Sequence, residues 1–136
     1  YAIQKIVKDH YKPFDDVEAI KIIKERMNEF GYEYIYLSTE QQEYYDAFQA
    51  EFGDKLIAMD RKRYLQKDVE NLEFALEKKF DRKNDRYFTG LDYIADTEGL
   101  LRCDHIIGTL TNAFYYVIIR NFELNNKLEL IDKGLH

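Results

Sequence analysis

The sequence is poor in several residue types that often reveal a function. Its 136 residues include one cysteine, one proline, three histidines and no tryptophan. A single cysteine, Cys103, excludes an internal disulfide, and its apolar neighbours favour a buried structural thiol over a nucleophile. Three dispersed histidines and one cysteine do not have the spacing of a zinc site. We therefore expect no metal, no cofactor and a reducing, cytoplasmic environment.

The chain also lacks long apolar runs and an excess of positive charge. Its apolar stretches are interrupted well before the roughly 18 residues that a membrane span needs, and no segment resembles a signal peptide. The formal net charge is −6, so no overall field favours nucleic acid. The basic run at 60–64 is local and is interpreted as a solvated loop. We expect a soluble protein that binds neither nucleic acid nor a membrane.

What the chain does have is enough apolar sequence for one core. Hydrophobic residues make up 46% of it, and no repeat or linker divides it, so residues 1–136 are predicted to form a single domain. The chain starts at Tyr1 without a methionine, and a helical pattern begins only after Pro13. We expect it to be a fragment of a longer protein.

Hydrophobic spacing and turn residues predict an alternating order of helices and strands. Helices are expected over 14–31, 40–53, 71–80, 86–102 and 111–121, and strands over 32–38, 55–60, 104–108 and 127–132. In the helix at 86–102, Tyr87, Leu91, Ile94 and Leu101 mark an apolar face. Because each parallel neighbour needs a crossover, this order predicts an α/β fold with a Rossmann-like open parallel sheet of about four strands and helices on both faces.

Ligands of such sheets bind where the strands end, and one junction there is rich in polar groups. Gly108 is followed closely by Thr109, Thr111 and Asn112. The glycine lets a ligand approach the backbone, and the free N–H groups at the start of the next helix attract an anion. The junction therefore predicts a phosphate site or, alternatively, a helix cap supplied by Thr111 or Asn112.

Two segments, YIYLSTE and YIADTEGLLRCDHIIGTLTNAF, resemble the nucleotide-binding, C-terminal half of GT-B glycosyltransferases related to α1,6-fucosyltransferases and protein O-fucosyltransferases. The similarity extends over about residues 14–136, although its motifs are short. The resemblance implies half of a GT-B fold, with GDP-fucose or a related nucleotide sugar as donor substrate. It also implies a glycan acceptor and an N-terminal half that completes the enzyme.

Matched residue by residue, the resemblance implies three sets of contacts with GDP. Asp96 matches the acidic residue that reads guanine, whose N1–H and exocyclic amine can both donate to a carboxylate. Thr109, Thr111 and Asn112 match the loop at the diphosphate. The nucleotide is also expected near Thr39 and Glu40. Without the resemblance, Asp96 is interpreted as a solvent-facing helical residue, because it lies off the apolar face of its helix.

The sequence departs from the family in one respect that bears on activity. The family carries a His- or Arg-containing motif that contacts the diphosphate, and no such motif occurs in this chain. We therefore do not expect the isolated chain to be active. Two alternatives stay open: a non-catalytic α/β interaction module, or a transferase that uses another nucleotide sugar. The twelve tyrosines and nine phenylalanines also lead us to expect self-association through an exposed apolar face.

Overall fold

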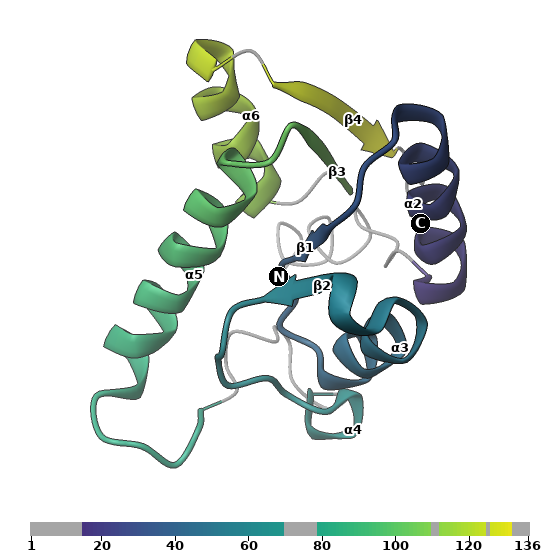
Figure 1. Cartoon of the computed structure of the whole chain (residues 1–136). Coiled ribbons are helices and arrows are strands. Elements are labelled where there is room, and N and C mark those ends of the chain that lie inside the picture. Colours follow the sequence, from purple (N-terminus) through teal and green to yellow (C-terminus); the bar gives the residue numbers. More distant parts are fainter. Residues whose placement is uncertain (1–14, 70–78, 110–111, 125, 132–136) are drawn as a thin grey trace, which may run out of the picture.

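The structure is a computed structural model that describes residues 15–69, 79–109, 112–124 and 126–131. In this part of the chain, helices and strands alternate (Figure 1). The order is α2 (Asp16–Phe30), β1 (Ile35–Leu37), α3 (Gln42–Phe52), the 3-10 helix η1 (Gly53–Lys55), β2 (Leu56–Ala58), α4 (Gln66–Val69), α5 (Asp85–Leu101), β3 (His105–Thr109), α6 (Asn112–Leu124) and β4 (Lys127–Ile131). None of the described helices combines the length and apolar character needed to cross a membrane.

Most predicted elements are confirmed within a few residues. The short helix α4 was not predicted, and the helix expected at 71–80 lies outside the described residues. Helix α2 shows why local signals sufficed: Ala19 and the partly buried Ile20 and Ile23 recur on one helical face and pack in a cluster with Leu37 of β1. The helix ends at Gly31, whose φ of 72° is a left-handed conformation that glycine adopts readily.

The four strands form parallel pairs, as predicted, but not one sheet. β1 pairs with β2, with Ile35 opposite Leu56, while β3 pairs with β4 from His105 opposite Lys127 onward. The described strands therefore make two separate two-stranded sheets, and the single open sheet of about four strands is not formed. The alternation of helices and strands in the sequence indicates how many strands there are. Which strands pair with each other depends on contacts between segments that are distant in the sequence.

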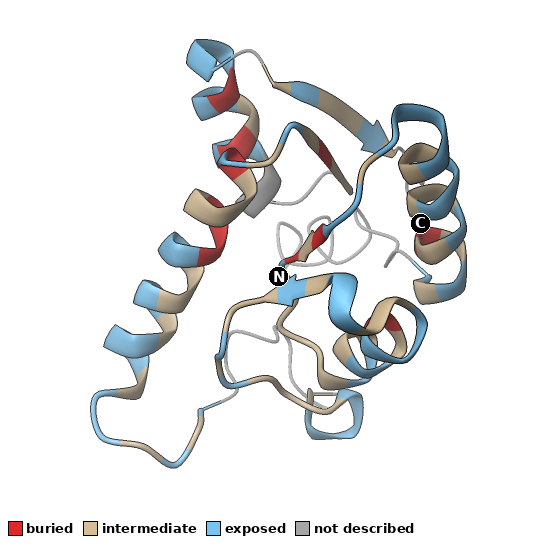
Figure 2. Ribbon diagram, in the orientation of Figure 1, coloured by how far each residue is buried: buried red, intermediate tan, exposed pale blue. Residues whose placement is uncertain are grey.

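Each sheet has its own apolar cluster and its own pair of helices. Helices α2 and α3 pack on β1 and β2 around Phe48, while α5 and α6 pack on β3 and β4 around Ile106 and Val117. Figure 1 shows the strands between these two helix pairs, and Figure 2 shows the buried residues on the helix faces that turn toward the strands. The chain is thus a mixed α/β structure with helices on two sides.

Most of the apolar face predicted for helix α5 is exposed. Tyr87, Leu91 and Ile94 are exposed, Ile94 to 60%. Of the predicted face only Leu101 is buried, and the other buried residues of α5 are the polar Asp96 and Thr97. Two polar side chains of α5 are thus turned toward the interior, which places Asp96 where a site could form.

Candidate functional site

A cavity of about 490 Å³ opens at the carboxyl ends of β1 and β3. Its walls come from β1 and the residues after it, the end of β3, the segment after β2 and the middle of α5, and also from side chains of α2, α3 and α6. Five of the residues predicted to contact a ligand line it: Thr39, Glu40, Asp96, Gly108 and Thr109. The fold therefore brings together residues from three separate segments at the strand ends.

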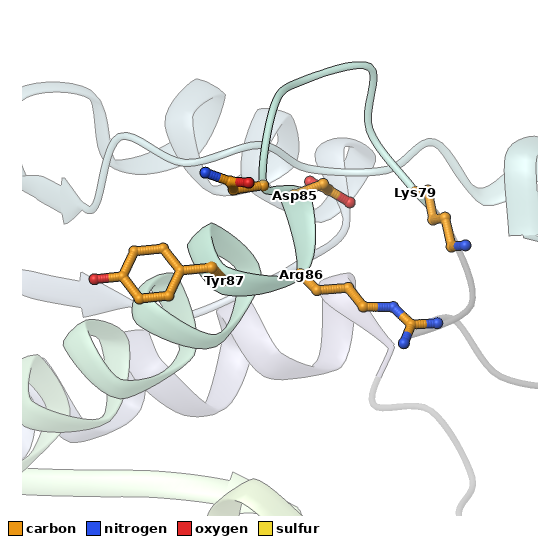
Figure 3. A pocket seen from close by; sticks show the side chains of 5 residues that line it. Lys79, Asp85, Arg86 and Tyr87 are labelled. Atoms are coloured by element: carbon orange, nitrogen blue, oxygen red, sulfur yellow. The ribbon is translucent and has the colours of Figure 1, made fainter.

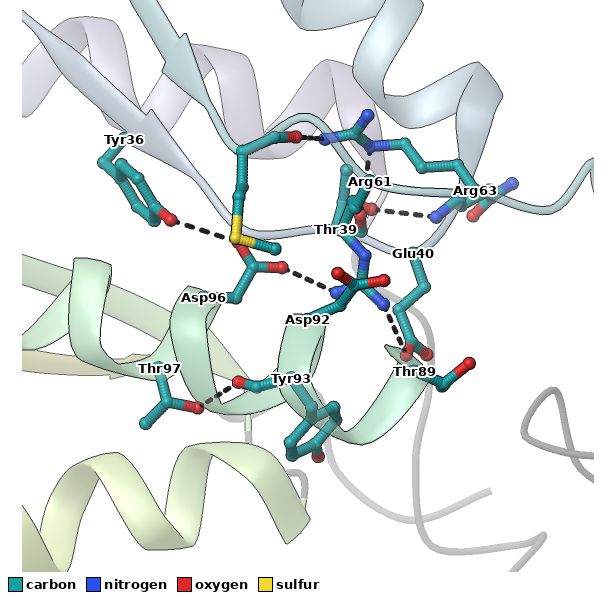
Figure 4. Close-up of polar contacts among 12 residues, drawn as sticks. Tyr36, Thr39, Glu40, Arg61, Arg63, Thr89, Asp92, Tyr93, Asp96 and Thr97 are labelled. Carbon is teal, nitrogen blue, oxygen red and sulfur yellow. Dashed lines mark hydrogen bonds and ion pairs between the residues drawn. The ribbon is translucent and has the colours of Figure 1, made fainter. Parts of the chain in front are cut away.

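Asp96 is buried, so its interpretation as a solvent-facing residue is wrong. Its Oδ1 atom accepts a hydrogen bond of 3.1 Å from the Tyr36 hydroxyl, and Oδ2 accepts one of 2.6 Å from Nη1 of Arg61. Both donors converge on the carboxylate in Figure 4. A carboxylate has about four lone-pair sites, and these contacts use two of them. The Asp96 carboxylate can therefore still accept hydrogen bonds from a ligand in the cavity.

Arg61 is the cation of this site, although it belongs to the basic run that was interpreted as a solvated loop. Its side chain is only 4% exposed, and its Nη2 atom lies 3.3 Å from Oε1 of Glu40. Its Nε atom is buried and has no hydrogen-bond partner among the described residues. The positive charge of Arg61 therefore faces two carboxylates, those of Asp96 and Glu40. Its attraction to them offsets part of the free-energy cost of burying these charges. The site still has more hydrogen-bond acceptors than donors.

The position of Tyr36 depends on a glycine in α5. Its ring lies so close to Gly99 that a Cβ there would be 2.7 Å from the ring's Cε1 atom, and closer still to its outer atoms. Burial, and then the neighbouring Asp96 carboxylate, raise the pKa of Tyr36 to about 12. The phenol therefore remains protonated at neutral pH and donates to Asp96.

The segment after β1 is held by the segment after β2. Arg63 donates from Nε to the carbonyl oxygen of Thr39 at 3.2 Å, and the Tyr64 N–H donates to the carbonyl oxygen of Glu40 at 2.9 Å. The Thr39 hydroxyl in turn accepts from the N–H of Gln41 at 3.2 Å. These bonds fix Thr39 and Glu40 at the rim of the cavity.

The junction between β3 and α6 is described only in part. Thr109 is the last residue of β3, pairs with Ile131 and lines the cavity. Thr111 lies outside the described residues. Asn112 is the first residue of α6, which begins just beyond this rim of the cavity. The phosphate site and the helix cap both remain predictions for this loop.

A larger hollow, of about 690 Å³, lies at the start of α5 (Figure 3), and its lining residues are Lys79, Asn84, Asp85, Arg86 and Tyr87. Asp85 already accepts hydrogen bonds from Nε of Arg82 at 2.6 Å and from the N–H of Phe80 at 3.1 Å. The bond from Arg82 is the main cause of the lowered pKa of Asp85. Because this hollow does not lie at the strand ends, the cavity at Asp96 is the better candidate.

Arg61 and Tyr36 were not predicted as site residues. Arg61 comes three residues after the end of β2, a position where ligand contacts are expected in parallel sheets, so its location was a usable signal. Tyr36 carried no such signal, because it lies inside a strand. Its role follows only from its contact with a helix 60 residues away.

Among the described residues, no three histidine, cysteine, aspartate or glutamate side chains are placed to hold a metal ion. Comparisons with protein-family models, with curated proteins and with solved structures found no match for this chain. The chemistry of the cavity at Asp96 is therefore the basis for assigning a function.

Proposed function

We propose that the cavity at Asp96 binds the GDP part of a nucleotide sugar, and that the chain is the nucleotide-binding, Rossmann-like half of a GT-B glycosyltransferase. The observation that carries this proposal is the convergence of Thr39, Glu40, Asp96 and Thr109 on one cavity. The cavity lies at the carboxyl ends of parallel strands, where α/β proteins bind their ligands. GDP-fucose is the donor that the family resemblance implies.

The charges of the cavity suit guanine at one end. Asp96 and Glu40 contribute two carboxylates against the single charge of Arg61, so this end repels phosphate and attracts N–H donors. Guanine presents two such donors on one edge, at N1 and at its exocyclic amine, whereas adenine lacks the N1–H. The base therefore lies at Asp96 in this proposal.

The diphosphate then lies at the other end, beside Thr109 and the start of α6. The first turn of a helix has free N–H groups and the positive end of the helix dipole, which together stabilise an anion. In the transfer reaction, the acceptor hydroxyl oxygen bonds to the anomeric carbon as the bond from that carbon to the phosphate oxygen of GDP breaks, and the hydroxyl proton passes to water or to the departing diphosphate. Negative charge develops on the leaving diphosphate, where helix-end N–H groups stabilise it.

Titration calorimetry with GDP, ADP, UDP and pyrophosphate tests the proposal. We expect GDP to bind most tightly, and Glu40→Gln to weaken GDP binding by about 1 kcal/mol. Glu43→Gln is the matched control, because Glu43 is a nearby exposed carboxylate that binds the N–H of Gln66 instead. Preference for UDP would indicate another nucleotide sugar. Binding of none of the four ligands would contradict the proposal and favour the interaction module.

A further inference from the structure

Two tyrosines line the cavity at Asp96 from different segments of the chain. Tyr93 lies on α5, three residues before Asp96 (Figure 4), and Tyr64 lies in the segment after β2. Residues three positions apart on a helix are neighbours on one of its faces, so Tyr93 and Asp96 share one wall of the cavity. Both tyrosines are half-buried. Each therefore presents part of its surface to the cavity that it lines.

The backbone of Tyr64 is fixed beside the segment that carries Glu40. Its N–H donates to the carbonyl oxygen of Glu40 at 2.9 Å, and its own carbonyl oxygen accepts from the N–H of Gln42 at 2.8 Å. These two bonds make a parallel β-bridge between Tyr64 and Gln41. Tyr64 therefore cannot leave the rim of the cavity without breaking main-chain hydrogen bonds.

Both tyrosines lie near the same ion pair of the cavity. Burial, and then the negative charge of Glu40, raise the pKa of Tyr64 and the pKa of Tyr93, while the positive charge of Arg61 opposes this shift. Arg61 and Glu40 are themselves paired, with 3.3 Å between Nη2 and Oε1. The polar groups of the cavity and its two uncharged tyrosines therefore occupy one region.

The other two tyrosines of the cavity have structural partners that account for their positions. Tyr36 donates to a carboxylate, and Tyr44 stacks on Phe48 with 5.1 Å between the ring centroids. Among the described residues, the rings of Tyr64 and Tyr93 stack on no aromatic ring and contact no cation. Binding cavities commonly combine aromatic walls with a few polar groups, so these two rings suit contact with a ligand.

We propose that the guanine ring stacks on the aromatic faces of Tyr93 and Tyr64, with the edge that carries N1–H and the exocyclic amine turned toward Asp96. This inference rests on the proposed function and adds the residues that hold the plane of the base. Aromatic side chains supply affinity for a base through stacking, whereas hydrogen bonds to its edge supply specificity. The two tyrosines therefore position the edge that Asp96 reads.

Stacking and hydrogen bonding to the base have different signatures. Every base has a π face, so stacking tolerates a change of base, whereas adenine lacks the N1–H that a carboxylate accepts in guanine. Loss of a tyrosine ring should therefore weaken the binding of GDP and of ADP by the same factor. Asp96→Asn should weaken the binding of GDP alone. Pyrophosphate has no ring, so its affinity should not depend on either tyrosine.

Titration calorimetry of the natural polypeptide with GDP, ADP and pyrophosphate tests the inference. Tyr93→Leu and Tyr64→Leu should each weaken the binding of both nucleotides at least about fivefold and leave the affinity for pyrophosphate unchanged. Tyr93→Phe and Tyr64→Phe preserve the ring and should keep most of the GDP affinity. Tyr87→Leu is the matched control, because Tyr87 is an exposed tyrosine of the same helix, outside this cavity. Its loss should change none of the three affinities.

A second measurement needs no variant. The H8 resonance of GDP should move upfield on binding to the parent protein, because ring currents shield a proton that lies over an aromatic face. Absence of this shift would overturn the inference.

The calorimetry separates this inference from the proposed function. GDP binding that both leucine variants retain in full would overturn the stacking and leave the proposed function standing. An equal loss of pyrophosphate affinity would assign the tyrosines to the fold, and an equal loss in the phenylalanine variants would assign the contact to the hydroxyls. Either result would overturn the inference. A parent protein that does not bind GDP would overturn it together with the proposed function.

Discussion

The Nη1 atom of Arg61 lies 2.6 Å from Oδ2 of Asp96, and each side chain is only 4% exposed. This ion pair joins the segment after β2 to the middle of α5, across 35 positions of sequence. It holds the Asp96 carboxylate at the wall of the cavity, where the Tyr36 hydroxyl also binds it. The pair is therefore both a link between the two helix pairs and the centre of the candidate site.

Arg61→Met should lower the free energy of unfolding by about 3 to 5 kcal/mol, because it leaves the Asp96 charge buried without its cation. Denaturation with urea measures the change. Lys62→Met is the matched control: the neighbouring side chain is exposed, so its loss should change stability by no more than about 0.5 kcal/mol. Similar small changes in both variants would contradict a structural role for the ion pair.

Two glycines of α5 should respond in opposite ways to alanine. Gly90 has no neighbouring atom within 4 Å of the place that an alanine methyl group would occupy, so Gly90→Ala should stabilise the helix by about 0.5 to 1 kcal/mol. Gly99→Ala should instead displace the Tyr36 ring and break its bond to Asp96, lowering stability by about 1 to 3 kcal/mol relative to Gly90→Ala. Urea denaturation compares the two variants.

An alkaline titration gives an independent readout of the same contact. Burial raises the pKa of Tyr36 to about 12, so displacing its ring in Gly99→Ala should let one tyrosine ionise at lower pH. Absorbance of the phenolate follows this ionisation, and Gly90→Ala should leave it unchanged. Equal stabilisation by both alanines, with no change in titration, would show that Tyr36 does not lie against Gly99.

The predictions that the structure confirms rest on local signals in the sequence. The end of α2 was predictable because Gly31 follows the last apolar residue of a regular pattern, and the strands were predictable from their β-branched and aromatic content. The burial of Asp96 was not, because the apolar stripe of α5 at Leu91 and Ile94 marks a face that is exposed. Asp96 is buried through Arg61 and Tyr36, which come from distant segments, and no local pattern reports such a pairing.

Acid should weaken a second link between the sheets. Arg26 of α2 donates from Nε and Nη2 to the carboxylate of Glu129 in β4, at 2.8 and 2.7 Å. These bonds are the main cause of the lowered pKa of Glu129. The ionised form therefore stabilises the fold above the ordinary pKa of glutamate, about 4.3. This contribution is lost as the pH falls through the lower pKa of the folded state.

Glu129→Gln should lower the free energy of unfolding at pH 7 by about 1 kcal/mol. The difference from the parent protein should shrink as the pH falls below about 4.3, because the parent then loses the same interaction. Urea denaturation across this pH range measures it. Glu29→Gln serves as the control, since Glu29 is exposed and lies 3.5 Å from Nη1 of Arg26. A difference that does not depend on pH would contradict this assignment.

We predict that helix α6 supplies the surface for the expected self-association. Helix α6 exposes Ile119 and Phe122 three positions apart, and Phe122 is 93% exposed. Ile119→Lys and Phe122→Ser should each reduce the average mass that light scattering reports at high protein concentration. Each substitution removes exposed apolar side-chain surface through which two copies would associate. Glu123→Gln, an exposed change on the same helix, is the control. A parent protein that stays monomeric over a wide concentration range would contradict this prediction.

The central claim is that Asp96 reads guanine, and one calorimetric comparison tests it most directly. The natural polypeptide and its Asp96→Asn variant are each titrated with GDP, ADP and pyrophosphate. The amide places a donor against a guanine donor, so we predict that GDP affinity falls by about 1 to 3 kcal/mol while the other two affinities barely change. Equal losses for all three ligands would show that Asp96 only supports the fold, and an unchanged GDP affinity would contradict the claim.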